Sequence, residues 1–269
     1  MAALPQNPIA AGTSSKASRA DVRAEEKLLV KEASAGRLTE ERRERVRQKI
    51  TADIPWWYSP WGHLAATTGI GLTVLGVSSV QLGRLASTHS AHPTRATDWL
   101  IVPMVFLLAN FFEWRVHKKV LHRRNKYIPP MQTIYDKHTP MHHMVYVEED
   151  MALRSTKEFR LVLIPAAGVL GIVLTASPIA IAIGRLWSAS AGWLFLVTAS
   201  LYMVTYEVLH LCYHAPSDSF IGRLAFIKVM RAHHAKHHDP RFMQKWNFNV
   251  TVPLFDWVMG TIAPKTKRG

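Results

Sequence analysis

The fold is decided by residues 161–184, LVLIPAAGVLGIVLTASPIAIAIG, and residues 186–206, LWSASAGWLFLVTASLYMVTY, which only Arg185 separates. A helix that crosses a bilayer needs about 20 predominantly apolar residues, and neither stretch contains a charge. Buried helices of a soluble protein are the alternative, but uncharged runs of this length are unusual there. The pair therefore predicts two membrane helices joined by a short turn.

Two earlier stretches complete a set of four. Residues 64–83 are uncharged, and residues 99–112 reach the spanning length if the helix tolerates Pro103 and continues into residues 113–115. Residues 54–61, IPWWYSPW, are rich in Trp and Tyr, which gather at membrane–water interfaces. We expect an all-α integral membrane protein with about four transmembrane helices in two hairpins and a cytosolic helical cap.

The overall composition taken alone gives a different impression. The chain has 269 residues, 33 Lys and Arg against 19 Asp and Glu, a net charge of +14 and a mean hydropathy of +0.01, which is typical of a soluble basic domain. However, 30 of the 33 basic residues lie in residues 1–63, 113–160 and 207–269, on one side of the four helices. Because cytoplasmic loops carry the Lys and Arg excess, we expect both termini in the cytoplasm and no nucleic-acid partner.

The N-terminal residues 1–53 form an extension before the membrane domain, which we place at residues 54–269. Residues 1–24 are small and polar, so we expect them to be disordered. Residues 25–50 mix Glu with Lys and Arg at helical spacing. They predict a solvated helix of no specific function, with a break at Gly36 and an N-cap at Thr39. The lone cysteine, Cys212, excludes an internal disulfide.

The histidines of the chain are the candidate metal ligands. Most of the 14 histidines fall in four clusters on the cytoplasmic side, at residues 117–122, 138–143, 210–214 and 233–238. Neutral imidazole is the commonest protein ligand for metals. An isolated histidine pair is usually a surface feature, but four clusters on one membrane face indicate a metal site. The predicted ligands are His117, His122, His138, His142, His143, His210, His214, His234, His237 and His238.

Helical geometry shows which rings can converge. His210 and His214 are four residues apart and share a helix face, and residues 234, 237 and 238 fit one arc of about 100°. His233 falls outside that arc and is predicted to be a neighbour. His117 and His122 are five apart, so their convergence requires a helix end or a distortion.

The second cluster and the carboxylates complete the predicted site. Thr139 and Pro140 suit the N-cap and first position of a helix that begins there. Ten imidazoles exceed one four-coordinate zinc site and suit two ions with about five ligands each. We predict that Glu113 and Glu207 lie next to the ligands, where each orients a ring N–H. The alternative for both is an acid that pairs helices or reaches to the interface.

The order and spacing of the boxes, HX4H, HX3HH, HX3H and HX2HH, resemble the fatty acid hydroxylase / sterol desaturase superfamily of membrane histidine-box enzymes. Residues 206–214 and 231–238 look close to fatty acid 2-hydroxylases, and the tail motifs at residues 246–249 and 255–261 are also similar. The resemblance covers roughly residues 100–262. One departure is the second box, which has three residues between His138 and His142 where the 2-hydroxylases have two.

The resemblance implies an O₂-dependent hydroxylase that attacks an unactivated C–H bond of a fatty acyl, sphingolipid or sterol-type lipid. It implies two non-haem irons, although zinc also accepts imidazole ligands. Electrons would come ultimately from NAD(P)H through a separate cytochrome- or ferredoxin-type donor with its reductase. A desaturase with the same centre is the alternative. A metal transporter is a more distant one, because its ligands would lie near the middle of the spanning helices.

The basic residues around the first box have two possible roles, and the predicted topology suits two kinds of membrane. Residues 118–126 carry five Lys and Arg side chains, which suit an anionic lipid head group or an acidic electron donor. Ordinary positive-inside charge explains them equally well, and is the preferred interpretation. The bacterial inner membrane and the endoplasmic reticulum both agree with the predicted topology.

Overall fold

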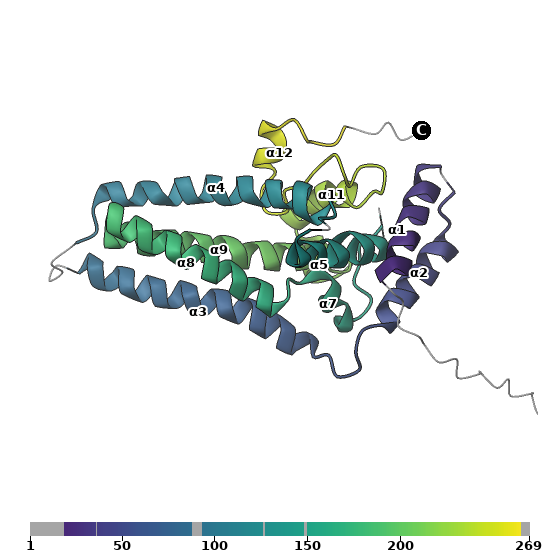
Figure 1. Ribbon diagram of the computed structural model, residues 1–269, viewed down its shortest axis with the longest axis horizontal. Coiled ribbons are helices and arrows are strands. Elements are labelled where there is room, and N and C mark those ends of the chain that lie inside the picture. Colours follow the sequence, from purple (N-terminus) through teal and green to yellow (C-terminus); the bar gives the residue numbers. More distant parts are fainter. Residues whose placement is uncertain (1–18, 36, 88–92, 126, 148–149, 265–269) are drawn as a thin grey trace, which may run out of the picture.

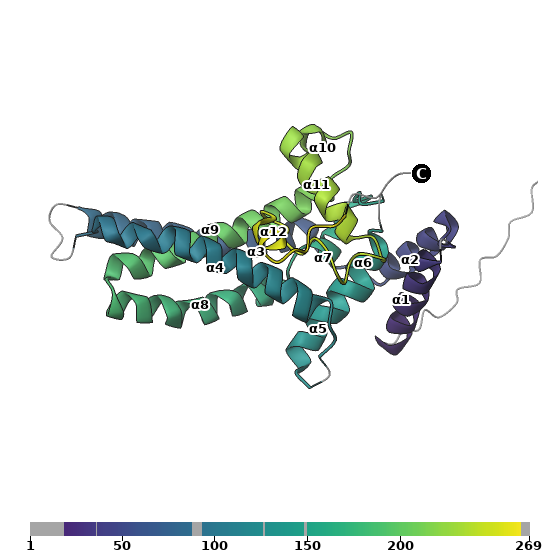
Figure 2. The same cartoon turned by 90° about the horizontal axis from the view of Figure 1, so that it is seen from above.

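The computed structural model describes residues 19–264 except residues 36, 88–92, 126 and 148–149. Four long helical segments lie side by side along the longest axis of the molecule, and shorter helices gather at one end (Figures 1 and 2). The segments are Pro60–Ala86, Ala96–Leu121, Thr156–Leu186 and Ala189–Tyr213, and all four are long and apolar enough to cross a membrane. The predicted all-α fold with four membrane helices is therefore confirmed.

The long segments come as two consecutive pairs along the chain, and the other three pack against α9. The first consists of α3 (Pro60–Ala86) and α4 (Ile101–Val116), and the second of α8 (Ala166–Leu186) and α9 (Ala189–Tyr213). Helix α9 contacts α3, α4 and α8. A short 3₁₀ helix, Ala96–Leu100, leads into α4, and Pro103 lies in the first turn of α4, where a proline breaks no helical hydrogen bond. The segment therefore tolerates this proline.

The turn between α8 and α9 is tight, as the single Arg185 between the two stretches predicts. Ser188 caps α9, because its hydroxyl accepts a hydrogen bond from the Ala191 N–H and donates one to Asp98 at 2.8 Å. At Gly192 a Cβ atom would lie 2.7 Å from the Ala180 carbonyl oxygen. A glycine at this position lets the two helices approach closely.

The third membrane segment is not one continuous α-helix, contrary to the uninterrupted stretch expected at residues 161–184. A 3₁₀ turn (Thr156–Glu158) and α7 (Phe159–Val162) end before residues 163–165, and α8 starts at Ala166. Pro165 has no N–H and stands immediately before α8. The free N–H of Ile164 donates instead to the carboxylate of Glu207 on α9, at 3.2 Å.

The N-terminal helices pack against the cap, which corrects two expectations. Helix α1 (Arg19–Ser34) already includes residues 19–24, which were expected to be disordered, and the preceding residues 1–18 lie outside the described part of the chain. Thr39 caps α2 (Glu40–Ala52) as predicted. Leu29, Val46 and Ile50 are buried in one core with residues 144–147. The two helices are therefore not a solvated extension (Figure 1).

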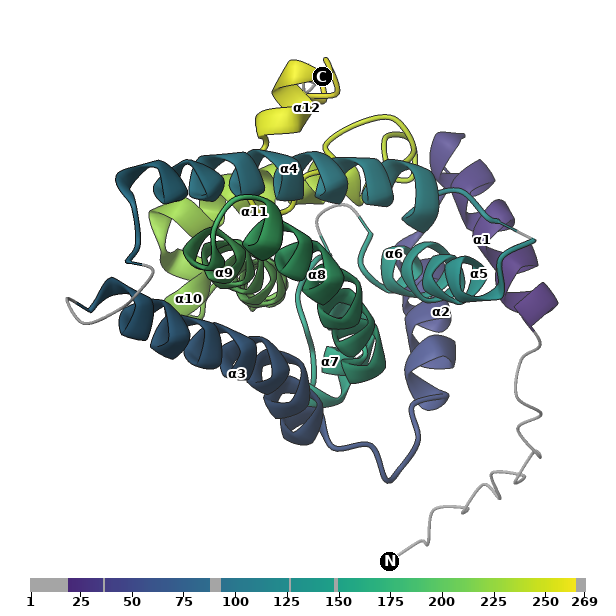
Figure 3. The same ribbon diagram turned by 60° about the vertical axis from the view of Figure 1, so that its left-hand side comes forward.

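The remaining short helices form the cap. They are α5 (Pro129–Lys137), α6 (His143–Val145), α10 (Phe220–Arg223), α11 (Ala225–His237) and α12 (Leu254–Val258). Figure 3 shows α12 against α4. There the Asn110 side chain accepts a hydrogen bond from the Phe255 N–H at 3.2 Å and donates to the Val252 carbonyl at 2.9 Å. The cap is thus fastened to the membrane helices by the Asn110 side chain in the C-terminal half of α4.

Candidate metal centre

The structure brings all ten predicted histidines together in the cap and divides them into two groups of five. Within each group the candidate ligand nitrogens lie within 4.8 Å of one another. The first histidine group consists of His117, His122, His138, His143 and His237. The second histidine group consists of His142, His210, His214, His234 and His238.

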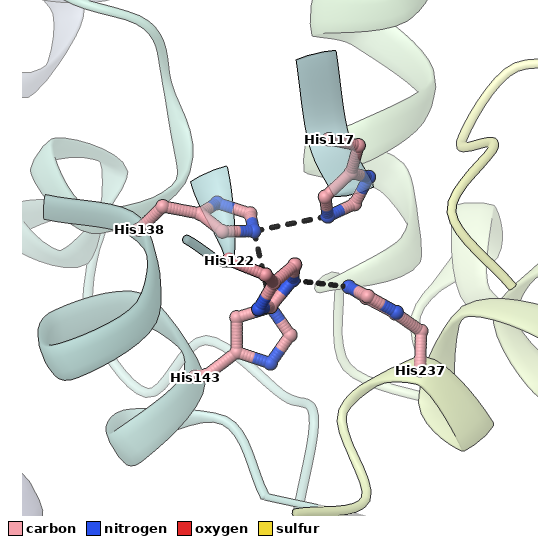
Figure 4. Close-up of side chains that lie close together, drawn as sticks. All are labelled: His117, His122, His138, His143 and His237. Atoms are coloured by element: carbon pink, nitrogen blue, oxygen red, sulfur yellow. Dashed lines mark hydrogen bonds between the residues drawn. The ribbon is translucent and has the colours of Figure 1, made fainter. Parts of the chain in front are cut away.

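In the first histidine group the Nε2 atoms point at one another (Figure 4). The Nε2 atom of His138 is 3.0 Å from that of His117 and 3.1 Å from that of His143. The Nε2 atoms of His122 and His237 are 2.9 Å apart. Four of the five side chains are buried, and that of His138 is partly exposed.

The second histidine group is completely buried. It combines two pairs from α-helices, one at the end of α9 and one at the end of α11, with His142 from the segment after α5. The Nε2 atoms of His234 and His238 are 3.1 Å apart. The rings of His143 and His238, one from each group, stack with centroids 4.1 Å apart, so the two groups adjoin.

Two π-helical turns explain the histidine pairs that are five residues apart. After α4 the chain continues as a π-helix, His117–Leu121, in which the His122 N–H bonds the His117 carbonyl. A π turn places residues i and i+5 above one another, and the His117 and His122 rings stack 5.2 Å apart. A second π-helix, His138–His142, brings His143 next to His138, and their rings lie edge to face with centroids 4.7 Å apart.

The expected helix start at Thr139 is wrong, since Thr139 and Pro140 lie inside this second π-helix. Pro140 has no N–H to offer the carbonyl four residues earlier, and the helix changes from α to π around it. The Thr139 hydroxyl donates instead to the Leu121 carbonyl at 2.6 Å. Its oxygen also lies 3.1 Å from Nδ1 of His122, so it links the first two boxes.

Backbone carbonyls orient several of the rings from behind. The Nδ1 atoms of His117, His214, His237 and His238 lie 2.5 to 2.9 Å from the carbonyl oxygens of Phe248, Met151, Trp246 and Tyr146, respectively. A carbonyl accepts only from a protonated nitrogen, so these Nδ1 atoms carry the hydrogen. The lone pair on Nε2 is thereby left to face the centre of each group.

Glu113 and Glu207 were expected to accept hydrogen bonds from histidine rings, but in the structure they bond other groups. Glu113 accepts hydrogen bonds from the Tyr202 and Thr251 hydroxyls and from the backbone N–H groups of Val250 and Thr251. Glu207 accepts from the Ile164 N–H. Both carboxylates therefore act one step away. Each holds a backbone segment. Glu113 holds the segment whose Phe248 carbonyl accepts from His117, and Glu207, three residues before His210 on α9, holds the break at Ile164.

Asp256 was not predicted as a site residue, although it lies in one of the family-like tail motifs. It is completely buried and accepts hydrogen bonds from the N–H groups of Phe248 and Asn249, both at 2.8 Å. It also lies 3.2 Å from Nε2 of His233, which places His233 outside both groups, as expected. Without contacts, sequence spacing gives no sign that a residue on α12 supports the first box.

Burial keeps the cap histidines neutral. It lowers the pKa of His122, His138, His142, His143, His234, His237 and His238 well below the usual value, and the neighbouring imidazoles lower each further. Burial lowers the pKa of His214 to about 3, although its hydrogen bond to Met151 acts in the opposite direction. Neutral imidazole is the form that binds metals.

This arrangement fits a pair of metal ions. Neutral acceptor nitrogens that face one another at 2.9 to 3.1 Å repel unless a cation or proton lies between them. Several buried ring nitrogens have no hydrogen-bond partner among the described residues, including both of His142 and the Nε2 atoms of His210 and His214. Metal–nitrogen distances of about 2.0 to 2.1 Å place opposite ligands about 4.2 Å apart, which agrees with the span of each group.

The family model for fatty acid hydroxylases matches residues 102–261, more than half of the chain. The chain belongs to the fatty acid hydroxylase family. The matched range agrees with the extent of the resemblance in the sequence, and family membership makes the chain an oxidoreductase whose relatives use iron. With four apolar helices of spanning length, this member of the family is a membrane protein.

A solved structure, full-length Scs7p with only its hydroxylase domain visible, shares the fold. The TM-score is 0.50 at 18% sequence identity, and the match covers 73% of this hydroxylase chain and 67% of that chain. At this identity the likeness concerns the fold alone. Comparison with curated protein sequences found no match.

Proposed function

We propose that this hydroxylase inserts one oxygen atom from O₂ into an unactivated C–H bond of a membrane lipid, with one iron in each histidine group. The observation that carries the proposal is the division of ten neutral, mostly buried imidazoles into two adjoining groups of five. Nitrogen ligands alone suit zinc as well as iron. The choice of iron follows from the family and from the redox chemistry that hydroxylation requires.

The reaction has a simple balance. One oxygen atom of O₂ enters the lipid as a hydroxyl group, and the other leaves as water after two electrons and two protons have been supplied. Bound iron supplies the activation of O₂ that such a C–H bond requires. A fatty acyl, sphingolipid or sterol-type substrate is consistent with the position of the site beside the ends of four apolar helices.

The protein's own residues would hold the metal ions, orient the ligand rings and shield the site from water. The Nε2 atoms provide the ligands, and the carbonyls of residues 146, 151, 246 and 248 fix the ring orientations. Burial of nine of the ten rings keeps bulk water away, which protects the oxidising centre from wasteful reduction. His117 and His210 lie at the ends of apolar membrane segments, so a lipid chain has a short path from the bilayer to the groups.

Lipid analysis under ¹⁸O₂ tests the reaction. Membranes that contain the wild-type protein should accumulate a lipid heavier by one oxygen, and the added oxygen should carry the ¹⁸O label. His234→Ala should abolish the product. Lys228→Ala, an exposed truncation on the same helix, should retain it. A product lighter by two hydrogens would identify a desaturase, and an unchanged lipid profile would refute both reactions.

Electrons are proposed to arrive from a separate donor protein at a basic hollow beside the first histidine group. Lys119, Arg123 and Arg124 line it together with Asn125 and Tyr127, directly around His122. This charge favours an acidic cytochrome or ferredoxin, reduced in turn at the expense of NAD(P)H. Arg123→Glu should raise the donor concentration needed for the half-maximal rate, and an unchanged value would place the donor elsewhere.

A further inference from the structure

The segment from Tyr146 to Glu158 supports the second histidine group from behind. The Tyr146 carbonyl accepts from Nδ1 of His238 at 2.6 Å, and the Met151 carbonyl accepts from Nδ1 of His214 at 2.8 Å. The Leu153 N–H donates to the His214 carbonyl at 2.7 Å. Two of the five candidate ligands therefore take their orientation from this segment, whose described residues form almost no regular secondary structure before the turn at Thr156.

Arg47 of α2 fastens this segment. One guanidinium nitrogen, Nη2, donates to the Ala152 carbonyl at 2.8 Å and to the Glu158 carboxylate at 2.6 Å. The other, Nη1, lies 3.5 Å from the Asp150 carboxylate. The guanidinium carbon is 5.4 Å from the centre of the Tyr146 ring, and the Tyr146 hydroxyl donates to the same Glu158 oxygen at 3.1 Å. One side chain thus touches the segment near both of its ligand-orienting carbonyls.

The contact between α2 and this segment combines a buried ion pair with apolar packing. Arg47 and Glu158 are only 3% and 4% exposed, so breaking their pair leaves a buried charge without compensation, which is strongly unfavourable. Val46 and Ile50, on either side of Arg47, pack with Met144, Val145 and Val147. Helix α2 therefore lies directly on the stretch that follows the second box.

We propose that Arg47 is a positioning residue for the second histidine group, and that the N-terminal helices α1 and α2 are part of the metal centre's scaffold. Helix α2 lies outside residues 102–261, which the family model matches. The proposal rests on the proposed function in one respect, namely that the histidine groups hold metal. It assigns to the N-terminal extension a role in metal retention, where the sequence indicates only a charged helix.

The consequence should be selective. Loss of the Arg47 contacts frees the carbonyls that orient His214 and His238, whereas none of the five rings of the first histidine group bonds this segment in the described structure. Removal of groups that orient metal-bound histidines typically weakens metal binding about 10- to 100-fold. We expect that loss in the second histidine group and little change in the first.

Metal content and chelator competition on the full-length iron-loaded protein in detergent test the proposal. Arg47→Met keeps most of the side-chain volume but strands Glu158, so Arg47→Met/Glu158→Gln serves as the second variant. Its amide oxygen still accepts from the Tyr146 hydroxyl. Wild type should hold two ions per chain, and the double variant should lose one of them at a chelator concentration about 10- to 100-fold lower. Arg45→Met, at an exposed position on the same helix, removes the same charge as Arg47→Met and should behave as wild type.

Further substitutions identify the ion that is lost. In the double-variant background, His238→Ala should leave the single remaining ion in place, whereas His122→Ala should remove it. If the double variant retains both ions with wild-type affinity, the proposal is overturned. Equal loss from both groups, or a fall in helical circular dichroism, also overturns it, because Arg47 would then support the fold in general. Wild-type protein without any metal would instead refute the proposed function.

Discussion

At the scale of single residues, the tautomer of each histidine decides which nitrogen is left to bind a metal. Four rings have their Nδ1 hydrogen fixed by a backbone carbonyl, a partner that no substitution can remove. His122 differs, because its Nδ1 atom lies 3.1 Å from the hydroxyl oxygen of Thr139. That hydroxyl donates its own hydrogen to Leu121, so it can only accept from the ring. A side chain therefore orients His122, and mutation can test it.

Replacement of Thr139 by Val keeps the shape of the side chain but leaves the His122 N–H without an acceptor. We expect metal affinity of the first histidine group to fall about 10- to 100-fold, measured by competition with a chelator. Thr133→Val is the matched control, since that hydroxyl donates within α5 to Pro129, and its affinity should equal that of wild type. Unchanged affinity in Thr139→Val would show that the hydroxyl does not orient the ring.

At the scale of elements, the interruption between α7 and α8 depends on a partner from α9. Ile164 lies in the break and its N–H donates to Glu207 at 3.2 Å, and Glu207 lies three residues before His210 on α9. Glu207 is 1% exposed, so no water is available to replace it. The break and the third histidine box are therefore coupled through one carboxylate.

Glu207→Leu should be destabilising, because it removes the acceptor of the part-buried Ile164 N–H, at a cost of up to about 1–3 kcal/mol. We expect a lower midpoint of thermal unfolding and less metal in the second histidine group. Glu207→Gln keeps one oxygen as an acceptor and should remain close to wild type in both measurements. Equal behaviour of the two variants would mean that the hydrogen bond to Ile164 is not what Glu207 contributes.

Elements also show what sequence could predict and what it could not. Runs of apolar residues fix membrane helices locally, and the family motifs identify the fold. The requirement for a distortion between His117 and His122 follows from helical geometry, but its form as a π turn is visible only in the structure, where the His117 ring also bonds the distant Phe248 carbonyl. The supports for the rings are backbone carbonyls, which carry no sequence signal. Burial of Arg47 against a segment about 100 residues away is likewise a tertiary contact.

At the scale of the whole molecule, most of the basic residues and both histidine groups lie at the same end. The N-terminal helices, the cap and both histidine groups lie at the same end of the four long segments, opposite the α8–α9 turn (Figures 1 and 2). Most Lys and Arg residues lie in these parts of the chain. The positive-inside rule applies to short loops near membrane helices, and we propose on this basis that the cap faces the cytoplasm. Reduced donors and NAD(P)H are available on that side.

Cysteine labelling tests this orientation. In a Cys212→Ala background, Arg45→Cys places a thiol on α2 and Thr97→Cys places one at the opposite end, both at exposed positions. A membrane-impermeant maleimide added to intact cells, or to spheroplasts in a bacterial host, should label residue 97 and spare residue 45. Inverted vesicles should show the reverse. Gln244→Cys, exposed in the cap, should follow residue 45, because residues 45 and 244 lie on the same side of all four segments. Labelling of residue 45 from outside would invert the orientation, whereas labelling of both residues from one face would contradict a membrane-spanning fold.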